Sequence, residues 1–195
     1  MQLDDGRLIQ TLAGAPKAPA AGGPGVRCGV CLTLFARPAT TILGIVKADH
    51  TGEYPWGGHV ALPGGRVKAS DASAQATALR ELHEEVGIAA WDVTLLGELG
   101  HFQTVSSGHD LHVTVCRWRR RCPLQLDPRE VAQILELDLG RVVELQRLSP
   151  PGGDRPEGAA PPPDFEWDGL PVWGVTARIL RGFCTLVLDG GCAVA

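Results

Sequence analysis

The sequence lacks any apolar run as long as the roughly 18–20 residues that a membrane-spanning helix needs. Its longest apolar stretches, near 28–36 and 172–188, are either short or broken by polar side chains. Two aspartates stand among the first five residues, where a signal peptide would be basic, and no apolar segment follows them. We therefore expect a cytoplasmic protein with no membrane partner.

Positive charge is also scarce, because 18 Lys and Arg residues stand against 22 Asp and Glu residues and the net charge is −4. A general nucleic-acid binder needs a basic surface that displaces counterions from the phosphate backbone. We therefore expect no nucleic-acid partner. The length of 195 residues corresponds to one domain, and no internal repeat is visible.

Cysteine is too scarce for a disulfide scaffold, with six residues in the whole chain, and we expect free thiols. Cys28 and Cys31 have the spacing of a metal-binding pair, but no second pair matches them. They lie in a predicted strand, and cysteine is among the most often buried residue types. Buried thiols without a metal are our interpretation of this pair.

Glycine and proline are abundant, with 25 and 15 residues, about a fifth of the chain against an average of about 12%. They gather in two low-complexity stretches, 13–25 and 149–163. The second contains six prolines, which exclude a helix or a central strand there. We predict a flexible N-terminal arm over residues 1–25 and a single domain over 26–195 that contains a loop at 149–163.

Strand patterns outnumber helix patterns in the remaining sequence, and their order is mixed. This order predicts an α+β fold, arranged as an α/β/α sandwich. The predicted strands are 26–36 and 41–48, paired as a hairpin, with 93–96, 111–118 and 142–148; the predicted helices are 72–86, 128–136 and 176–183.

The most informative segment is 62–88, which joins a glycine turn to the first predicted helix. Gly64 and Gly65 let the backbone approach a ligand or a metal closely. The helix can begin after a cap at Asp71 or Ser73, and Gly87 suits the position just past its end.

Three acidic residues of this helix, Glu81, Glu84 and Glu85, are spaced to share one face. Their mutual repulsion would be offset by a divalent cation, and hard oxygen ligands suit Mg²⁺ or Mn²⁺. Arg80 is adjacent and can pair with one of the carboxylates. The alternative interpretation is an ordinary solvated helix face.

This segment resembles the Nudix box, G-x5-E-x7-R-E-U-x-E-E-x-G-U, in which U is apolar. Asp71 takes the place of the first glutamate, and eight residues rather than seven separate it from Arg80. The resemblance implies a Nudix fold, in which a mixed central sheet carries the loop and helix of the box. The matching residues are Gly65, Arg80, Glu81, Leu82, Glu84, Glu85, Gly87 and Ile88.

Two further segments, 58–65 and 172–180, resemble the G-x3-F-P-G-G and W-G-x-T-A-x-I/V-L patterns of the coenzyme A pyrophosphatase branch. Segment 130–137 is also similar to that branch, so the resemblance extends over about residues 26–184. An arginine-containing element that the branch carries upstream of the box is absent. Lys47 stands near its first arginine and Tyr54 in place of its second.

The resemblance implies hydrolysis of a nucleoside diphosphate linked to another group, with Mg²⁺ or Mn²⁺ as cofactor. Glu81, Glu84 and Glu85 would hold the metal, with the carbonyl of Gly65 as a further ligand. Glu84 or Glu81 would act as the base and Arg80 would support them. A later acid, Glu130 or Glu166, is the alternative base.

The implied substrate is coenzyme A or a derivative, cleaved to 3′,5′-ADP and 4′-phosphopantetheine. We expect Lys47, Gly64, Arg66 and Arg117 to bind it, Arg117 because arginine suits phosphate geometry. Other nucleotides are alternatives, namely ADP-ribose, NADH, a dinucleoside polyphosphate or a dNTP, as is a non-catalytic nucleotide-sensing module. A homodimer is left open. Trp167 and Trp173 either lie in the core or stack on a base, and we favour the core for Trp173.

Overall fold

A computed structural model describes residues 1–17, 25–49, 57–105, 107–119, 122–148 and 163–194. Most of the loop predicted at 149–163 lies outside these residues. A mixed seven-stranded sheet forms the centre, in the order β4-β3-β2-β7-β6, with β5 paired to β2 and β8 to β3. The strands are β2 (Arg27–Arg37), β3 (Ala39–Lys47), β4 (Val60–Ala61), β5 (Gly64–Arg66), β6 (Val93–Gln103), β7 (Asp110–Trp118) and β8 (Val131–Asp138).

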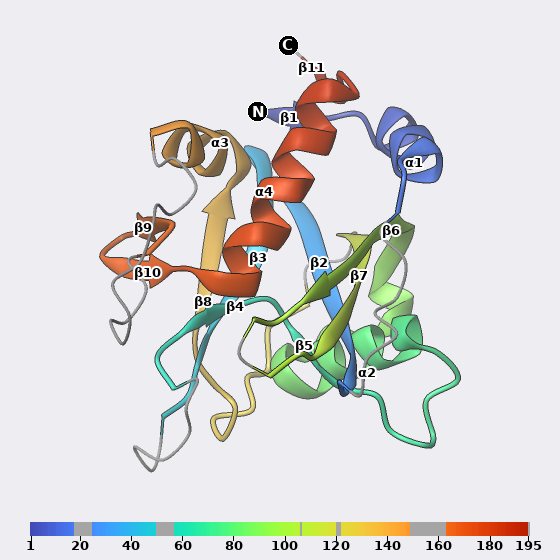
Figure 1. Cartoon of the computed structure of the whole chain (residues 1–195), viewed down its shortest axis with the longest axis vertical. Helices are drawn as coiled ribbons and strands as arrows, with labels where there is room; N and C mark the ends of the chain where they lie inside the picture. Colours follow the sequence, from blue (N-terminus) through green and yellow to red (C-terminus); the bar gives the residue numbers. More distant parts are fainter. Residues whose placement is uncertain (18–24, 50–56, 106, 120–121, 149–162, 195) are drawn as a thin grey trace.

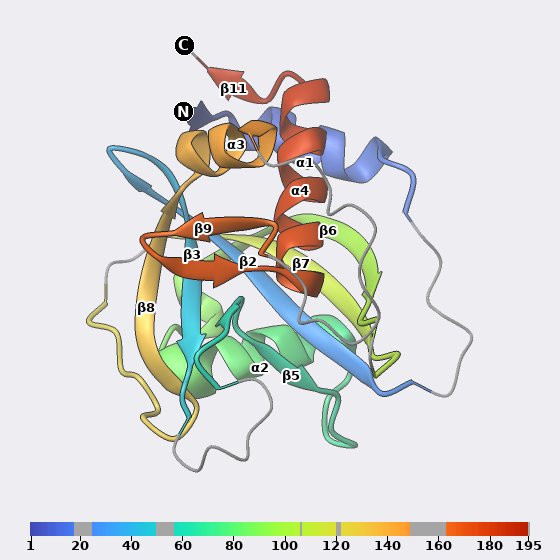
Figure 2. The same cartoon turned by 60° about the vertical axis from the view of Figure 1, so that its left-hand side comes forward.

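Helices cover both faces of this sheet, which confirms the predicted α/β/α sandwich. Helix α2 (Ala74–Val86) lies on one face, while α1 (Asp5–Gly14), α3 (Leu139–Leu148) and α4 (Gly174–Asp189) lie on the other (Figures 1 and 2). Side chains of β2 point alternately to the two faces of the sheet, so this strand packs against the helices on both faces. Leu32 and Leu34 pack toward α4, and Cys31 and Phe35 pack toward α2.

The helix of the glycine-rich segment forms as predicted, and its ends have clear local causes. The Ser73 side chain caps the N-terminus by accepting a hydrogen bond from the amide of Ala76. Gly87 ends the helix with φ +80°, a conformation that glycine adopts without a Cβ penalty. A Cβ there would also lie 2.9 Å from Gln125, so both the backbone conformation and the contact with Gln125 favour glycine.

The N-terminal segment differs from the predicted flexible arm. Strand β1 (Gln2–Leu3) pairs with β11 (Ala193–Val194), so the two termini lie side by side (Figures 1 and 2). Helix α1 follows, capped by Asp4, and it buries Leu8 and Leu12 completely. Leu8 and Leu12 are four residues apart, which is the spacing of one face of a helix. Our prediction of a flexible arm followed the low-complexity sequence next to them instead.

The order predicted for 128–148 was wrong, because the strand comes before the helix. Strand β8 pairs antiparallel with β3, and the register shifts between Val46 and Lys47. The bulge breaks the strict alternation of β8, which is why its pattern resembled a helix. The β-branched pair Val142 and Val143 suggested a strand, yet both are buried on one face of α3.

A small hairpin of β9 (Phe165–Trp167) and β10 (Leu170–Val172) precedes α4, and a 3₁₀ turn, η1 (Ala90–Asp92), precedes β6. Trp167 lies in the core, whereas Trp173, which we had placed there, is partly exposed at the start of α4. Cys28 and Cys31 are buried free thiols, as predicted. In the described part of the chain, no helix is long and apolar enough to cross a membrane.

Candidate active site

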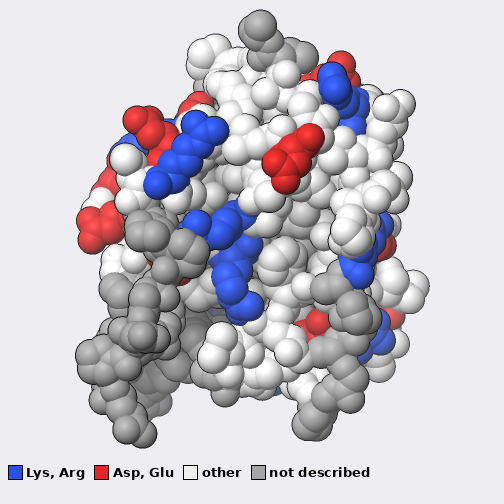
Figure 3. All heavy atoms as spheres, turned by 45° about the horizontal axis from the view of Figure 1, so that its top comes forward, with Lys and Arg blue, Asp and Glu red and all other residues white. Residues whose placement is uncertain are grey.

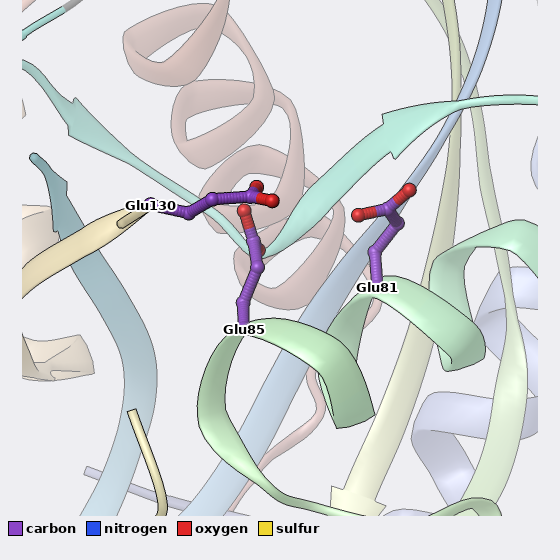
Figure 4. Close-up of side chains that lie close together, drawn as sticks. All are labelled: Glu81, Glu85 and Glu130. Atoms are coloured by element: carbon purple, nitrogen blue, oxygen red, sulfur yellow. The ribbon is translucent and has the colours of Figure 1, made fainter. Parts of the chain in front are cut away.

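Three carboxylates meet beside α2, from the buried Glu81 and Glu85 and the exposed Glu130. One oxygen from each lies within 4.8 Å of the other two. Glu81 and Glu85 project from α2 in the same direction, and Glu130 reaches toward Glu85 from the chain that leads into β8 (Figure 4). Such a cluster of oxygen ligands is the kind of site that Mg²⁺ and Mn²⁺ occupy.

Backbone hydrogen bonds bring Glu130 to this position, although it is distant in sequence. The amides of Gln125 and Asp127 donate to the last carbonyls of α2, those of Val86 and Glu85, at 3.0 and 3.1 Å. The carbonyl of Glu130 accepts from the amide of Ala48 just past β3, at 2.9 Å. The segment between α2 and β8 therefore covers the helix end and delivers the third carboxylate.

Glu130 was only an alternative in the sequence, and the structure places it in the cluster. Glu166, the other alternative, is exposed on β9 and lies outside the cluster. In the sequence only the similarity of segment 130–137 to the coenzyme A branch set Glu130 apart from Glu166. The fold of the 125–130 segment is what brings Glu130 to the other two acids.

Glu85 is the most buried of the three acids, with 1% of its side chain exposed. Burial raises its pKa to about 7, although Lys47 and the amide of Gly64 act in the opposite direction. The Lys47 ammonium donates to one carboxylate oxygen of Glu85, and the amide of Gly64 donates to the other at 3.0 Å. Lys47, predicted to bind substrate, therefore lies directly beside the acidic cluster.

Gly65 lies directly against Glu81. A Cβ at this position would approach the Glu81 carboxylate to 2.5 Å, so a larger residue would displace the acid. The approach of this turn to a ligand or a metal, which the sequence predicted, stays a prediction. The role of the Gly65 carbonyl as a metal ligand stays a prediction.

Arg80 makes hydrogen bonds to three acidic side chains at and before α2. Its guanidinium donates to both oxygens of Asp71, at 3.0 and 2.9 Å, and to Glu81 and Glu84, at 2.6 and 2.8 Å. Arg80 holds the pKa of Asp71 well below its usual range, and Asp71 raises the pKa of Arg80. Asp71 thus supplies a partly buried ion pair at the start of the box, despite its shorter side chain and different spacing.

Glu84 lies outside the three-carboxylate cluster. Its side chain is 45% exposed and is held by Arg80 and by Lys68, at 2.8 and 3.3 Å. The same nitrogen of Arg80 also contacts Glu81, so Glu84 remains adjacent to the cluster. Its predicted roles as metal ligand and base stay predictions.

A cavity of about 590 Å³ opens beside the acidic cluster, and Lys47, Gly64 and Gly65 belong to its lining. Most of its remaining wall is apolar. At the start of α4, Trp173 contacts His59 edge to face with ring centres 4.8 Å apart, and burial lowers the pKa of His59. Further lining residues are Leu62, Leu111, Thr104, Val175 and Ile179.

Two of the predicted substrate ligands are not among the residues that line the cavity. The side chain of Arg66 is exposed at the end of β5, and Arg117 pairs with Asp5 of α1, Nε to Oδ1 at 3.1 Å. Arg117 is separated from the cavity residue Leu111 by roughly 20 Å of strand, at about 3.3 Å per residue. Arg117 is therefore not part of the cavity lining, and its phosphate clamp stays a prediction. Trp173, for which we favoured the core over stacking on a base, lines the cavity.

Comparisons with known proteins agree with this geometry. A family model described as a NUDIX domain matches residues 29–160. The chain is 34% identical over 156 residues to NudL of Yersinia pestis (strain Pestoides F), described as an uncharacterized Nudix hydrolase. The alignment covers 80% of this chain and 76% of that protein, and NudL of Yersinia pseudotuberculosis serotype O:1b matches equally.

Solved structures show the same fold at low sequence identity. A NUDIX hydrolase from Alicyclobacillus acidocaldarius has a TM-score of 0.58 at 15% identity and covers 87% of this chain and 94% of its own. A binary complex of the C. elegans Ap4A hydrolase has a TM-score of 0.56 at 14% identity, with coverage of 84% and 98%. At these identities the likeness concerns the fold alone.

The chain therefore belongs to the NUDIX domain family. It is a Nudix pyrophosphohydrolase, an enzyme class that hydrolyses the pyrophosphate bond of nucleotide derivatives.

Proposed function

We propose that this enzyme hydrolyses coenzyme A or its derivatives in a reaction that depends on Mg²⁺ or Mn²⁺, with 3′,5′-ADP and 4′-phosphopantetheine as products. The observation that carries the proposal is the cluster of Glu81, Glu85 and Glu130 beside a large, mostly apolar cavity. A diphosphate at the glycine turn would lie between the acids and the cavity. The attached group would then extend along the apolar wall.

The chemistry of the donor set fits a hard divalent cation. Three carboxylates crowd together at one point, and two of them are buried. Lys47 and Arg80 each offset part of this charge, and a divalent cation would offset the rest. Glu81 and Glu85 would hold the cation with Glu130, and Glu84 would join them from the outer face. When bound, the cation would neutralise diphosphate charge and acidify the attacking water.

The chain's own residues have distinct proposed roles around this centre. Arg80 fixes the carboxylates of Glu81 and Glu84 in position, since it donates to both. Lys47 stands between Glu85 and the cavity and would bind a diphosphate oxygen. Glu130, the exposed acid of the cluster, would accept the proton of the attacking water, in place of Glu84 or Glu81.

The coenzyme A assignment has two supports from different sources. The segments 58–65 and 172–180, which resemble the coenzyme A branch, both contribute to the cavity wall, through His59 and Leu62 and through Trp173 and Val175. The wall is also mostly apolar, which suits the uncharged pantetheine arm better than a second nucleotide with its own phosphates. The cytoplasmic location and a homodimer stay predictions.

A substrate panel tests the proposal directly. The purified chain is incubated with coenzyme A, an acyl-coenzyme A, ADP-ribose, NADH, Ap4A and dNTPs, each with Mg²⁺ or Mn²⁺, and products are resolved by HPLC. We expect coenzyme A or its acyl derivative to be cleaved with the highest kcat/KM, to the two products named above. Rapid cleavage of another nucleotide without coenzyme A turnover would replace this substrate with that one.

A further inference from the structure

Helix α4 begins at the wall of the substrate cavity. Its first three residues, Gly174, Val175 and Thr176, all belong to the cavity lining, together with Trp173 before them. The contact between Trp173 and His59 places this helix end beside β4, and the glycine turn follows β4 along the chain. The start of α4 therefore opens on the same cavity as the glycine turn.

The backbone at the start of α4 offers hydrogen-bond donors that the helix does not use. The first bond of the helix runs from the amide of Ala177 to the carbonyl of Trp173, at 3.4 Å. The amides of Gly174, Val175 and Thr176 come before it and have no partner within the helix. No side chain caps this end, and the first turn contains no acidic residue. The positive end of the helix dipole is therefore not compensated by the helix's own residues.

A buried hydroxyl at the same place has no partner either. Thr176 is only 8% exposed, and in the part of the chain that the structure describes its hydroxyl makes no hydrogen bond. The hydroxyl is not sealed inside the protein, because the sealed polar atoms without a partner belong to other residues, namely His112, Thr114, Trp118 and Gln146. Its remaining exposure therefore faces the cavity that Thr176 lines. Buried hydroxyls are normally hydrogen-bonded, so a free one beside open space indicates a ligand.

The charge and the free space at this wall favour a negative ligand. Among the described residues that line the cavity, Lys47 is the one with a full charge, and no aspartate or glutamate is present. On the molecular face in Figure 3, by contrast, basic and acidic side chains are interspersed. Gly174 has φ +64°, and a Cβ there would meet no atom within 4 Å, so the space in front of the helix is open.

We propose that the N-terminus of α4, with the hydroxyl of Thr176, binds a phosphate group of the nucleotide substrate. The site rests on the proposed function, since it belongs to the same cavity. Amides at a helix N-terminus bind phosphate through their aligned N–H groups and the helix dipole, and the hydroxyl adds a further donor. Coenzyme A offers this group twice, in its diphosphate and in its 3′-phosphate.

A titration with inorganic phosphate tests the site without any substrate. Phosphate is added to the full chain in EDTA, so that no metal at the glutamates recruits it, and backbone amide NMR signals report where it binds. We expect the signals of Gly174, Val175 and Thr176 to move together. Thr176→Val should weaken binding by at least about tenfold, because a hydrogen bond to a charged group is lost. Thr176→Ser keeps the hydroxyl and should bind normally, as should Thr185→Val, at an exposed position on the same helix.

Kinetics with Mg²⁺ then identify the phosphate group. The kcat/KM values of wild type and Thr176→Val are measured for coenzyme A and for 3′-dephospho-coenzyme A. A loss for coenzyme A alone assigns the site to the 3′-phosphate, and an equal loss for both substrates assigns it to the diphosphate. If the chain cleaves a different nucleotide, the phosphate titration still tests the site, so failure of the coenzyme A assignment is distinguishable from failure of this inference.

Two outcomes would overturn the site. One is a folded wild-type chain in which the amides of residues 174–176 do not respond to phosphate, or in which only signals of the glycine turn respond. The other is equal phosphate affinity and equal kcat/KM in wild type and Thr176→Val, because the site depends on the hydroxyl.

Discussion

At the scale of single residues, the acidic centre depends on a balance between burial and charge. Glu85 is nearly inaccessible, and its charge is compensated by Lys47 and by the amide of Gly64. Glu81 is in contact with Arg80 on one side and with Gly65 on the other. Each acid therefore has a fixed orientation before any cation binds, which reduces the reorganisation needed for catalysis.

Glu85→Gln should reduce hydrolysis by roughly 10²–10³-fold or more, because an amide is a poorer ligand for a hard cation than a carboxylate. Circular dichroism should show an unchanged fold, since glutamine has nearly the same shape. Glu144→Gln, at an exposed position on α3, serves as the control and should retain full activity. Full activity of Glu85→Gln with Mg²⁺ present would refute the metal assignment.

Asp71 should make stability depend on pH in the acid range. Its pKa is lowered by Arg80, so the ion pair stabilises the fold above the usual Asp value of 3.8 and is lost as the pH falls below it. Asp71→Asn should be less stable than wild type near neutral pH, and the difference should shrink as the pH falls. Denaturant unfolding at a series of pH values measures this. A difference that does not change with pH would contradict the explanation.

At the scale of elements, the way in which α2 ends determines where the next segment, which carries Glu130, begins. Gly87 allows the chain to turn out of the helix in the left-handed conformation, and it makes room for Gln125. The segment that begins at Gln125 carries Glu130 into the acidic cluster. A change at the helix end should therefore affect both stability and catalysis.

Gly87→Ala should destabilise the protein by about 1–2 kcal/mol, the cost of a Cβ in the left-handed conformation, with more from the contact to Gln125. Because the 125–130 segment would shift, kcat should fall as well. Gly14→Ala at the end of α1, where a Cβ meets nothing within 4 Å and φ is not positive, is the matched control. Unchanged kcat in a destabilised Gly87→Ala would show that the segment does not position Glu130.

At the scale of the whole molecule, the first and last strands of the described chain pair with each other. Strand β1 pairs with β11, and the side chain of Arg7 donates to the carbonyl of Gly190 at 3.1 Å. Helix α1 packs on β6, where Leu12 lies against Gly97. The N-terminal residues are thus a part of the core layer opposite α2, although they are far from the active site.

Leu12→Ala should lower the free energy of unfolding by about 2–5 kcal/mol, because it leaves a cavity in the core layer. KM should stay unchanged, since no residue of α1 lines the substrate cavity. Ile9→Ala, at a position that is 42% exposed, is the control and should cost far less. A loss of stability as small as that of Ile9→Ala would mean that α1 is not part of the cooperative core.

The sequence by itself determined the helix of the box, its glycine turn and the sandwich class, because these depend on local spacing and on a long, specific pattern. Only the tertiary structure decided the partners that come from distant segments. The place of Glu130 in the acidic cluster follows from backbone hydrogen bonds of the 125–130 segment, and the place of Trp173 on the cavity wall follows from how α4 packs. The contact of Lys47 with Glu85 and the pairing of Arg117 with Asp5 likewise join segments that are distant in sequence, so local spacing does not predict them.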